Sequence, residues 1–395
     1  MIKNFFHEKV SLLLSFLILS NYLFLSLNFP EIIIKINFVL FLVTVLFFYF
    51  NNLVDNFYLK LFFLLMFLIA LGTPTYEWDP RSIWLFHAKR IFYDGSIFSV
   101  ADNYASFSHN EYPNLVPAFS SSLATLLGYW NEVLPKLSFL FMYLPPLILS
   151  FAIFKNEKYI IFLSLVFFFI GKYLINGWAD GLVAVYFSLS ALLMYLLIIE
   201  NQKNGKDTLY FLLAFCFFVI LTLIKNEGIA LLLILFVVTF FIIIFKGKLK
   251  KNIYNLFYLS FSFIPIILWK YFCFLNGIEN DYINSNFFVN LLPRISDFEN
   301  IKLIGYFIFL NEKFLISLVF LSIVFWIKKN SNLLIYVFTI NLLYILIISL
   351  IFLATPVDFY FQLDSAAARI VKSINFCLAF FALYNLNAKN VQLSK

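Results

Sequence analysis

The stretch IALLLILFVVTFFIIIF at residues 229–245 carries no charged side chain, and lysines follow it directly at positions 246, 248, 250 and 251. As an α-helix, such a stretch rises about 26 Å, which is close to the hydrocarbon thickness of a bilayer, about 30 Å. Apolar side chains would cover all sides of this helix, so a water-soluble fold could not hide them all. The stretch therefore predicts a membrane-spanning helix that ends in a basic loop.

Similar apolar runs recur along the whole chain, in which 63% of residues are hydrophobic and only 12% are charged. Soluble domains carry about 25% charged residues. We predict an all-α polytopic membrane protein with about 12 spanning helices, in which residues 1–395 form one transmembrane domain with no separate soluble domain. The predicted spans are Val10–Phe29, Ile32–Phe50, Phe57–Gly72, Val133–Phe154, Tyr159–Ile175, Gly181–Ile199, Thr208–Ile224, Ile229–Phe245, Tyr254–Leu275, Lys313–Ile327, Leu333–Ala354 and Ala366–Leu386.

The lysines set the expected topology. Segment 113–130 is apolar but contains Pro117 and a run of three serines, so its sequence alone does not decide whether it crosses. If it stays on the outer side, the basic loops all lie on the side of the N-terminus, as the positive-inside rule requires. We therefore expect both termini in the cytoplasm, loop 73–132 outside, and location in a bacterial inner membrane. The lysines concerned are Lys3, Lys9, Lys155, Lys158, Lys203, Lys206, Lys246, Lys248, Lys250, Lys251, Lys328 and Lys329.

In this topology, ionisable residues collect at the outer ends of successive spans. Such groups are costly at membrane depth unless partners or water surround them, so we expect them to share one polar cavity. Each also has a simpler interpretation: Asp180 as a helix start, Lys225 and Glu227 as a mutual pair, and Arg369 as a side chain that reaches outward to the interface. The candidate residues are Glu77, Asp79, His87, Lys89, Arg90, His109, Glu111, Asp180, Lys225, Glu227, Asp364 and Arg369.

The beginning of the long loop predicts an interfacial helix. Asp79 followed by Pro80 is a typical N-cap and first-turn pair. The residues up to Tyr93 then place an apolar stripe on one side and polar residues on the other, a pattern typical of a helix on a membrane surface. The stripe consists of Trp84, Leu85, Ala88, Ile91 and Phe92, and the polar side consists of His87, Arg90 and Asp94.

Other sites receive little support from the sequence. The net charge of +7 is modest and lies mostly in short loops, so no nucleic-acid partner is expected. Cys216, Cys273 and Cys377 each fall inside an apolar run, which favours neither a disulfide framework nor a zinc site. The three histidines offer no ligand pair at helical metal spacing, although the outer carboxylates leave a divalent metal ion open.

Several short motifs occur in an order that resembles the GT-C superfamily of multipass glycosyltransferases. This superfamily includes protein O-mannosyltransferases, aminoarabinose transferases and bacterial family 39 proteins, and the resemblance covers most of the chain. Many relatives carry two adjacent acids in the first loop, whereas here Trp78 separates Glu77 from Asp79. The motifs are Trp78-Asp79, Trp84, Lys89, Gly95, Tyr112-Pro113, Pro117, Gly128, Ala179-Asp180-Gly181, Lys225-Asn226-Glu227-Gly228, Ser365 and Arg369.

The resemblance implies transfer of a hexosyl or pentosyl group from a polyprenyl-phosphate donor on the extracytoplasmic side. The acceptor, whether lipid, glycan or protein, stays open, and membrane lipids are further expected partners. Asp79 is the favoured general base on the acceptor hydroxyl. Lys89, Lys225 and Arg369 would bind the donor phosphate. The residues expected to bind the acceptor or to act as a second acid are Asp180, Glu227 and Glu77.

Three other functions compete with the transferase hypothesis. A transporter or flippase of a lipid-linked or anionic substrate would also need cations in a membrane cavity, but such proteins often contain matching internal repeats, which are not evident here. A polymerase or ligase of lipid-linked glycans usually carries its largest outer loop late in the chain, whereas here it is early. In a non-catalytic scaffold, the outer acids and bases would be individually replaceable.

Overall fold

The computed structural model describes residues 6–51, 57–75, 77–154, 157–168, 171–200, 207–280, 287–328 and 330–392, and these residues form helices and turns without a β-strand. The all-α prediction is therefore confirmed. Short 3₁₀ or π segments used below are η2 (Pro80–Trp84), η4 (Ser106–Ser108) and η6 (Tyr195–Glu200). The α-helices are α1 (Phe6–Ser26), α2 (Glu31–Phe50), α3 (Phe57–Gly72), α4 (Leu85–Asp94), α5 (Leu115–Leu127), α6 (Leu137–Met142), α7 (Leu144–Ile153), α8 (Glu157–Phe168), α9 (Asp180–Met194), α10 (Asp207–Ile224), α11 (Asn226–Phe245), α12 (Leu249–Ser260), α13 (Ile264–Leu275), α14 (Phe287–Ser296), α15 (Phe298–Phe309), α16 (Glu312–Lys328), α17 (Ser331–Ala354) and α18 (Phe359–Gln392).

Within the described ranges, eight helical segments are long and apolar enough to cross a membrane: α1, α2, α9 continued by η6, α10, α11, α12 continued by α13, α17 and α18. Large apolar side chains stay exposed on their surfaces, for example Phe245 in α11 and Phe274 in α13. Water would penalise such a surface, whereas lipid tails accommodate it. The chain is a multi-pass α-helical membrane protein.

The expected number of about 12 spans is not confirmed. Three predicted spans form shorter apolar helices, namely α3, the α6–α7 pair and α8. The predicted span at 313–327 corresponds to α16, which is bent by 68° relative to α15, so the two helices count as one span only if a broken span is accepted. By length and composition, the described part of the chain thus contains eight helices able to cross a membrane, or nine if this bent pair is counted as one span.

Helix α5 occupies the apolar segment 113–130, whose crossing was uncertain. It has 13 residues, which corresponds to about 20 Å of rise, less than the hydrocarbon thickness of about 30 Å. Its residues from Leu115 to Ala124 are buried, and Gly128 ends it in the left-handed region (φ 79°). This length agrees with a segment that does not cross.

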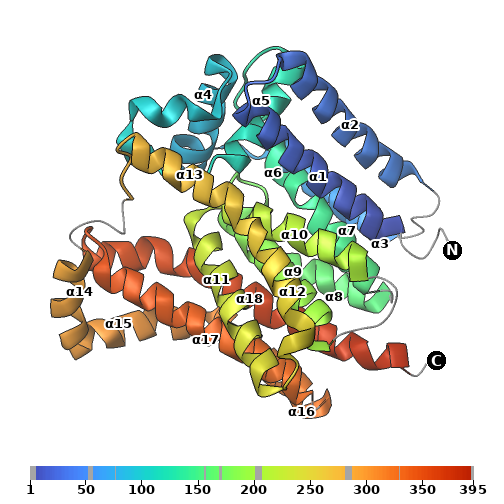
Figure 1. Cartoon of the computed structure of the whole chain (residues 1–395), viewed down its shortest axis with the longest axis vertical. Helices are drawn as coiled ribbons and strands as arrows, with labels where there is room; N and C mark the ends of the chain where they lie inside the picture. Colours follow the sequence, from blue (N-terminus) through green and yellow to red (C-terminus); the bar gives the residue numbers. More distant parts are fainter. Residues whose placement is uncertain are drawn as a thin grey trace.

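Contacts between helix ends define one side of the molecule, which we call the loop face. There, Lys225 before α11 meets the start of α9, Lys270 of α13 reaches the start of α11, and Arg369 in the first part of α18 reaches the residue before η2. Helix α1 starts and α18 ends on the opposite side (Figure 1). Helix α9 lies at the centre, with almost all of its residues buried. The loop face therefore brings together polar residues that are far apart in the sequence.

Candidate functional site

The π-helical segment η2 continues directly into α4, and Asp79 stands at its start. The residue has helical backbone angles (φ −58°, ψ −48°), and its side chain caps no backbone N–H. Pro80 has no N–H to be capped. Instead, the Asp79 carboxylate accepts a hydrogen bond from the guanidinium of Arg369 in α18, 290 residues further on. The capping interpretation of Asp79 is therefore wrong, and its carboxylate faces the interior of the loop face.

The prediction that His87 lies on the polar side of this helix is also wrong. Its side chain is buried, and Nε2 lies 2.9 Å from the main-chain oxygen of Ser108, to which it donates in the neutral ring. Burial lowers the pKa of His87 to about 4. Arg90, by contrast, reaches Asp102 through two hydrogen bonds of 3.1 and 2.8 Å. The helix is thus fastened to its own loop by a buried imidazole and a bidentate ion pair.

Three ionisable residues form a compact cluster at the start of α9 and α11. The Lys225 ammonium lies 3.0 Å from an Asp180 oxygen and 3.1 Å from a Glu227 oxygen, and all three side chains are mostly buried. The tight connection from α10 to α11 makes this possible, because a Cβ on Gly228 would lie 1.9 Å from the main-chain oxygen of Leu221. Only glycine permits that approach without displacement of one helix. The expected Lys225–Glu227 pair therefore exists, and Asp180 is a second carboxylate partner of Lys225.

Three contacts hold Arg369. Besides Asp79, its Nε donates to the main-chain oxygen of Ser365 at 3.0 Å, and its guanidinium carbon lies 4.7 Å from the ring centre of Trp178. The turn before Trp178 packs against the start of the η2 segment, because a Cβ on Gly177 would lie 3.4 Å from Pro80. A guanidinium that stacks on an indole face while pairing with a carboxylate is well fixed in position.

A cavity of about 750 Å³ opens beside these groups. One part of its wall is polar and charged, and the other part is formed by aliphatic and aromatic side chains of α11, α17 and α18. The polar part consists of Asp79, His109, Lys225, Asn226, Glu227, Lys270, Asn280, Gln362, Ser365 and Arg369, and the apolar part includes Ile229, Leu233, Ile347, Ile348, Ile351, Phe352 and Ile370. An amphiphilic ligand with a polar head and a hydrocarbon chain suits this division.

The cavity contains one cation that the sequence interpretation missed. Lys270 in α13 donates to the main-chain oxygen of Glu111 at 2.9 Å and to the side-chain oxygen of Asn226 at 2.7 Å. Its signal in the sequence was a lysine inside the apolar run at 254–275, since an ionisable residue within a span is a functional candidate by default.

The structure brings together five of the predicted site residues. Asp79, Lys225, Glu227 and Arg369 line the cavity, and Asp180 lies behind Lys225. Two other predicted residues lie outside the cavity wall: Lys89, which is 3.4 Å from a Glu132 oxygen, and Glu77. Arg90, a further cation of the loop, pairs with Asp102 instead.

The carboxylates do not form a metal centre in the described part of the chain. No group of three or more His, Cys, Asp or Glu side chains there could hold a metal ion. Asp79 faces a guanidinium, and Asp180 and Glu227 share one ammonium. We therefore assign no step to a metal ion.

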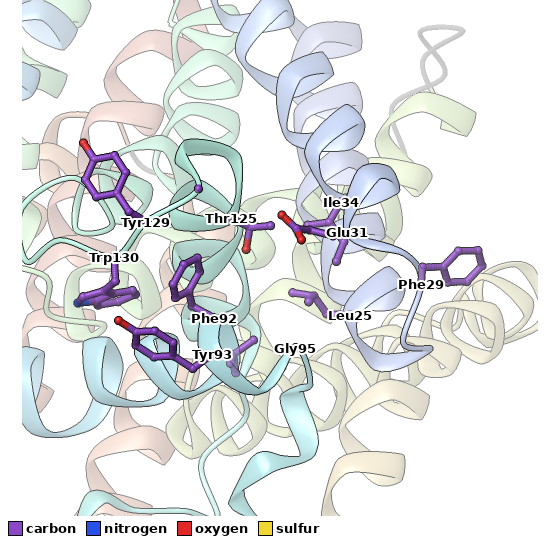
Figure 2. A pocket seen from close by; sticks show the side chains of 12 residues that line it. Leu25, Phe29, Glu31, Ile34, Phe92, Tyr93, Gly95, Thr125, Tyr129 and Trp130 are labelled. Atoms are coloured by element: carbon purple, nitrogen blue, oxygen red, sulfur yellow. The ribbon is translucent and has the colours of Figure 1, made fainter.

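A second cavity of about 650 Å³ lies on the same side of the molecule, between the α1–α2 turn and the ends of α4 and α5. Figure 2 shows aromatic side chains of Phe92, Tyr93, Tyr129 and Trp130 on one side of it and Glu31 on the other. None of the predicted site residues lines this cavity. Its lining resembles an interfacial aromatic belt more than a reaction site.

Fold and site together define a multi-pass helical membrane protein with a charged and amphiphilic cavity at one end of its bundle. No family model matches the chain, and no curated protein or solved structure matches it either. Functional inference therefore depends on the residues of the cavity.

Proposed function

We propose that the protein is a membrane glycosyltransferase of the GT-C type, which moves a sugar from a polyprenyl-phosphate donor to an acceptor hydroxyl. The observation that supports this most is the division of the 750 Å³ cavity into a charged part and an apolar part. A lipid-linked phosphosugar has the same division, because an anionic, polyhydroxylated head is attached to a long hydrocarbon chain. The chain would lie along α17 and α18, and the head would face Asp79 and Arg369.

In the proposed reaction, the acceptor hydroxyl oxygen attacks the anomeric carbon of the donor sugar. The carbon–oxygen bond to the phosphate breaks, and the polyprenyl phosphate leaves with the bonding electron pair. Asp79 takes the proton of the hydroxyl. Arg369 and Lys225 stabilise the charge that develops on the phosphate, which is a task suited to donors that packing already holds in place. Asp180 and Glu227 keep Lys225 in position.

The ion pair between Asp79 and Arg369 sets the order of donor binding and base activation in this reaction. Donor phosphate would compete with the Asp79 carboxylate for the same guanidinium, while Trp178 and the Ser365 oxygen hold Arg369 in place throughout. Asp79 would thus lose its cation and turn to the acceptor only after the donor binds. Donor binding is then required before the base is available.

The proposed orientation follows from the basic loops. The loop face would lie outside, both termini in the cytoplasm, and the protein in a bacterial inner membrane. In that arrangement, the cavity is accessible to lipid-linked donors that have reached the outer leaflet. Acceptor recognition then belongs to the loop around α4.

The Asp79→Asn variant tests the proposal directly. Transfer of radiolabelled sugar from a polyprenyl-phosphate donor should fall by at least about 10²-fold, because a general base contributes that much or more. Binding of polyprenyl phosphate should instead be retained or become stronger, since the variant no longer competes for Arg369. Equal transfer by both proteins at matched abundance would reject Asp79 as the base.

The same experiment separates the main alternative. Paired charges inside a membrane protein also mark transport pathways, and the Asp180–Lys225–Glu227 cluster fits that use. A flippase would move a fluorescent polyprenyl-phosphate sugar across proteoliposomes without cleaving it. Movement without transfer, over a panel of acceptors, would replace the transferase proposal by this one.

A further inference from the structure

Lys270 differs from the other cations of the cavity in its partners. Its two hydrogen-bond acceptors, the Glu111 main-chain oxygen and the Asn226 side-chain oxygen, are both uncharged. Lys225, in contrast, contacts two carboxylates and Arg369 contacts one. Among the described residues, no carboxylate lies within ion-pair distance of Lys270, and the Glu111 carboxylate acts on its charge only from beyond that distance.

The position of the ammonium is fixed from two directions. Trp269 donates its Nε1 to the same Glu111 oxygen at 3.1 Å, so two adjacent side chains of α13 fasten this helix to the segment between η4 and α5. The Glu111 carboxylate lies 3.9 Å from Nδ1 of His109. An ammonium has three N–H donors, and two are used here, which leaves one for a ligand in the cavity.

The neighbourhood favours an anion. Asn226 is the first residue of α11, and Asn226, Glu227 and Ile229 at the start of this helix line the cavity. The N-terminus of a 20-residue helix carries a partial positive charge and attracts phosphate groups. Lys270 adds a full positive charge at that helix end, next to an apolar wall that a lipid chain can follow.

We propose that Lys270 binds the phosphate of the lipid-linked donor and holds it at the N-terminus of α11, next to Arg369. This inference rests on the proposed function and adds a phosphate ligand from α13. Lys225, whose charge two carboxylates partly offset, still faces the phosphate together with Arg369, and Lys270 adds a third cation whose direct partners are uncharged. Lys270 is thus the cation that selects a phosphorylated lipid over the corresponding alcohol.

The test measures binding to the full-length protein in phosphatidylcholine nanodiscs. The ligands are polyprenyl phosphate and the neutral polyprenol, and the proteins are wild type, Lys270→Met, Lys270→Arg and the surface control Lys302→Met. We expect Lys270→Met to weaken polyprenyl-phosphate binding by about tenfold or more, as expected for loss of a charged hydrogen bond. Polyprenol binding should stay unchanged, Lys270→Arg should retain much of the phosphate preference, and Lys302→Met should behave as wild type.

Other results would overturn the inference. If Lys270→Met binds polyprenyl phosphate as tightly as wild type, Lys270 is no phosphate ligand, even where wild type transfers sugar normally. If phosphatidylglycerol competes as well as polyprenyl phosphate does, the site binds membrane lipid phosphates in general and the donor assignment fails. If Lys270→Met loses both ligands and Lys270→Arg restores neither, the residue has a structural role only.

Failure of the proposed function gives a different pattern. Wild type would then bind polyprenyl phosphate in a Lys270-dependent way without transferring sugar to any acceptor. That pattern would support Lys270 as an anion ligand while it rejects the transferase.

Discussion

At the scale of single residues, the charged side chains of the loop face are held by specific partners. Breaking one buried pair by removal of a single partner typically costs about 3–5 kcal/mol, because an uncompensated charge stays behind. Asp79, Asp180, Lys225 and Arg369 are therefore poorly suited to an interpretation as incidental surface groups. Asp79 and Arg369 pair across 290 positions of the sequence, and Asp180 and Lys225 pair across 45.

The buried imidazole of His87 gives a pH dependence at this scale. Its pKa is about 4 in the folded protein and 6.5 in an unfolded chain, so between these values the unfolded state binds more protons. Stability must then decrease as the pH falls through this window, by up to about 3 kcal/mol from His87 alone. We expect the thermal midpoint of the detergent-solubilised wild type to fall more between about pH 7 and pH 4.5 than that of His87→Gln.

Glutamine is a suitable replacement because its amide N–H can still donate to the Ser108 oxygen but does not titrate in this range. Equal losses of midpoint in the two proteins would contradict burial of a neutral His87. Carboxylates that titrate in both proteins change both midpoints alike, so the difference between the two proteins reports on His87.

At the scale of elements, the site depends on how closely α10 and α11 approach each other. The motif Lys225-Asn226-Glu227-Gly228 ends one helix, starts the next and places an ammonium between two carboxylates. Its glycine is required by the Leu221 oxygen, since the added Cβ would lie 1.9 Å away. The motif therefore serves packing as well as charge, because its glycine lets α10 and α11 approach each other closely.

Replacement of this glycine by alanine should separate the two helices. We expect Gly228→Ala to lower the free energy of unfolding by about 1–3 kcal/mol, as overpacked sites do, and to reduce sugar transfer through displacement of Lys225. Gly305→Ala in α15 is the matched control, because its added Cβ would meet only Phe309 at 3.9 Å. Thermal midpoints and transfer rates of both variants check this, and equal behaviour of the two would contradict the tight α10–α11 contact.

At the scale of the whole molecule, antiparallel helices collect polar helix ends at one face and leave apolar surfaces around the bundle. The cavity lies between α11, α17 and α18, and its wall is completed by Asp79 before α4, by His109 and Tyr112 after α4, and by Lys270 of α13. This is a favourable place for a ligand that arrives from the bilayer, because its chain need not leave an apolar environment. Polar chemistry can then occur next to the lipid phase.

The proposed orientation can be checked by cysteine labelling of a variant that lacks the three native cysteines. We expect Ala101→Cys, in the loop around α4, to react with a membrane-impermeant maleimide in intact cells. Lys250→Cys, at the start of α12, should react only after the membrane is opened. Both positions are exposed in the structure, so the reverse labelling pattern would invert the topology.

The sequence by itself determined that this protein lies in a membrane. Apolar runs as long as a bilayer is thick predict membrane helices, because each helix forms its backbone hydrogen bonds internally whatever surrounds it. The eight long spans of the described chain were all predicted in this way. The number of crossings was not determined in the same way, because the apolar content of a short helix such as α8, or of a bent one such as α16, does not fix whether it crosses.

The tertiary structure decided which charges meet. Arg369 lies 290 positions after Asp79, and Lys270 contacts Asn226 although it lies 44 positions further along the chain. No local pattern contains such a pairing, since each side chain alone fits a helix cap, an interfacial residue or a snorkelling lysine. Only the packing of helices and of the loop before η2, which sets the distance between side chains far apart in the sequence, turns these separate residues into one cavity.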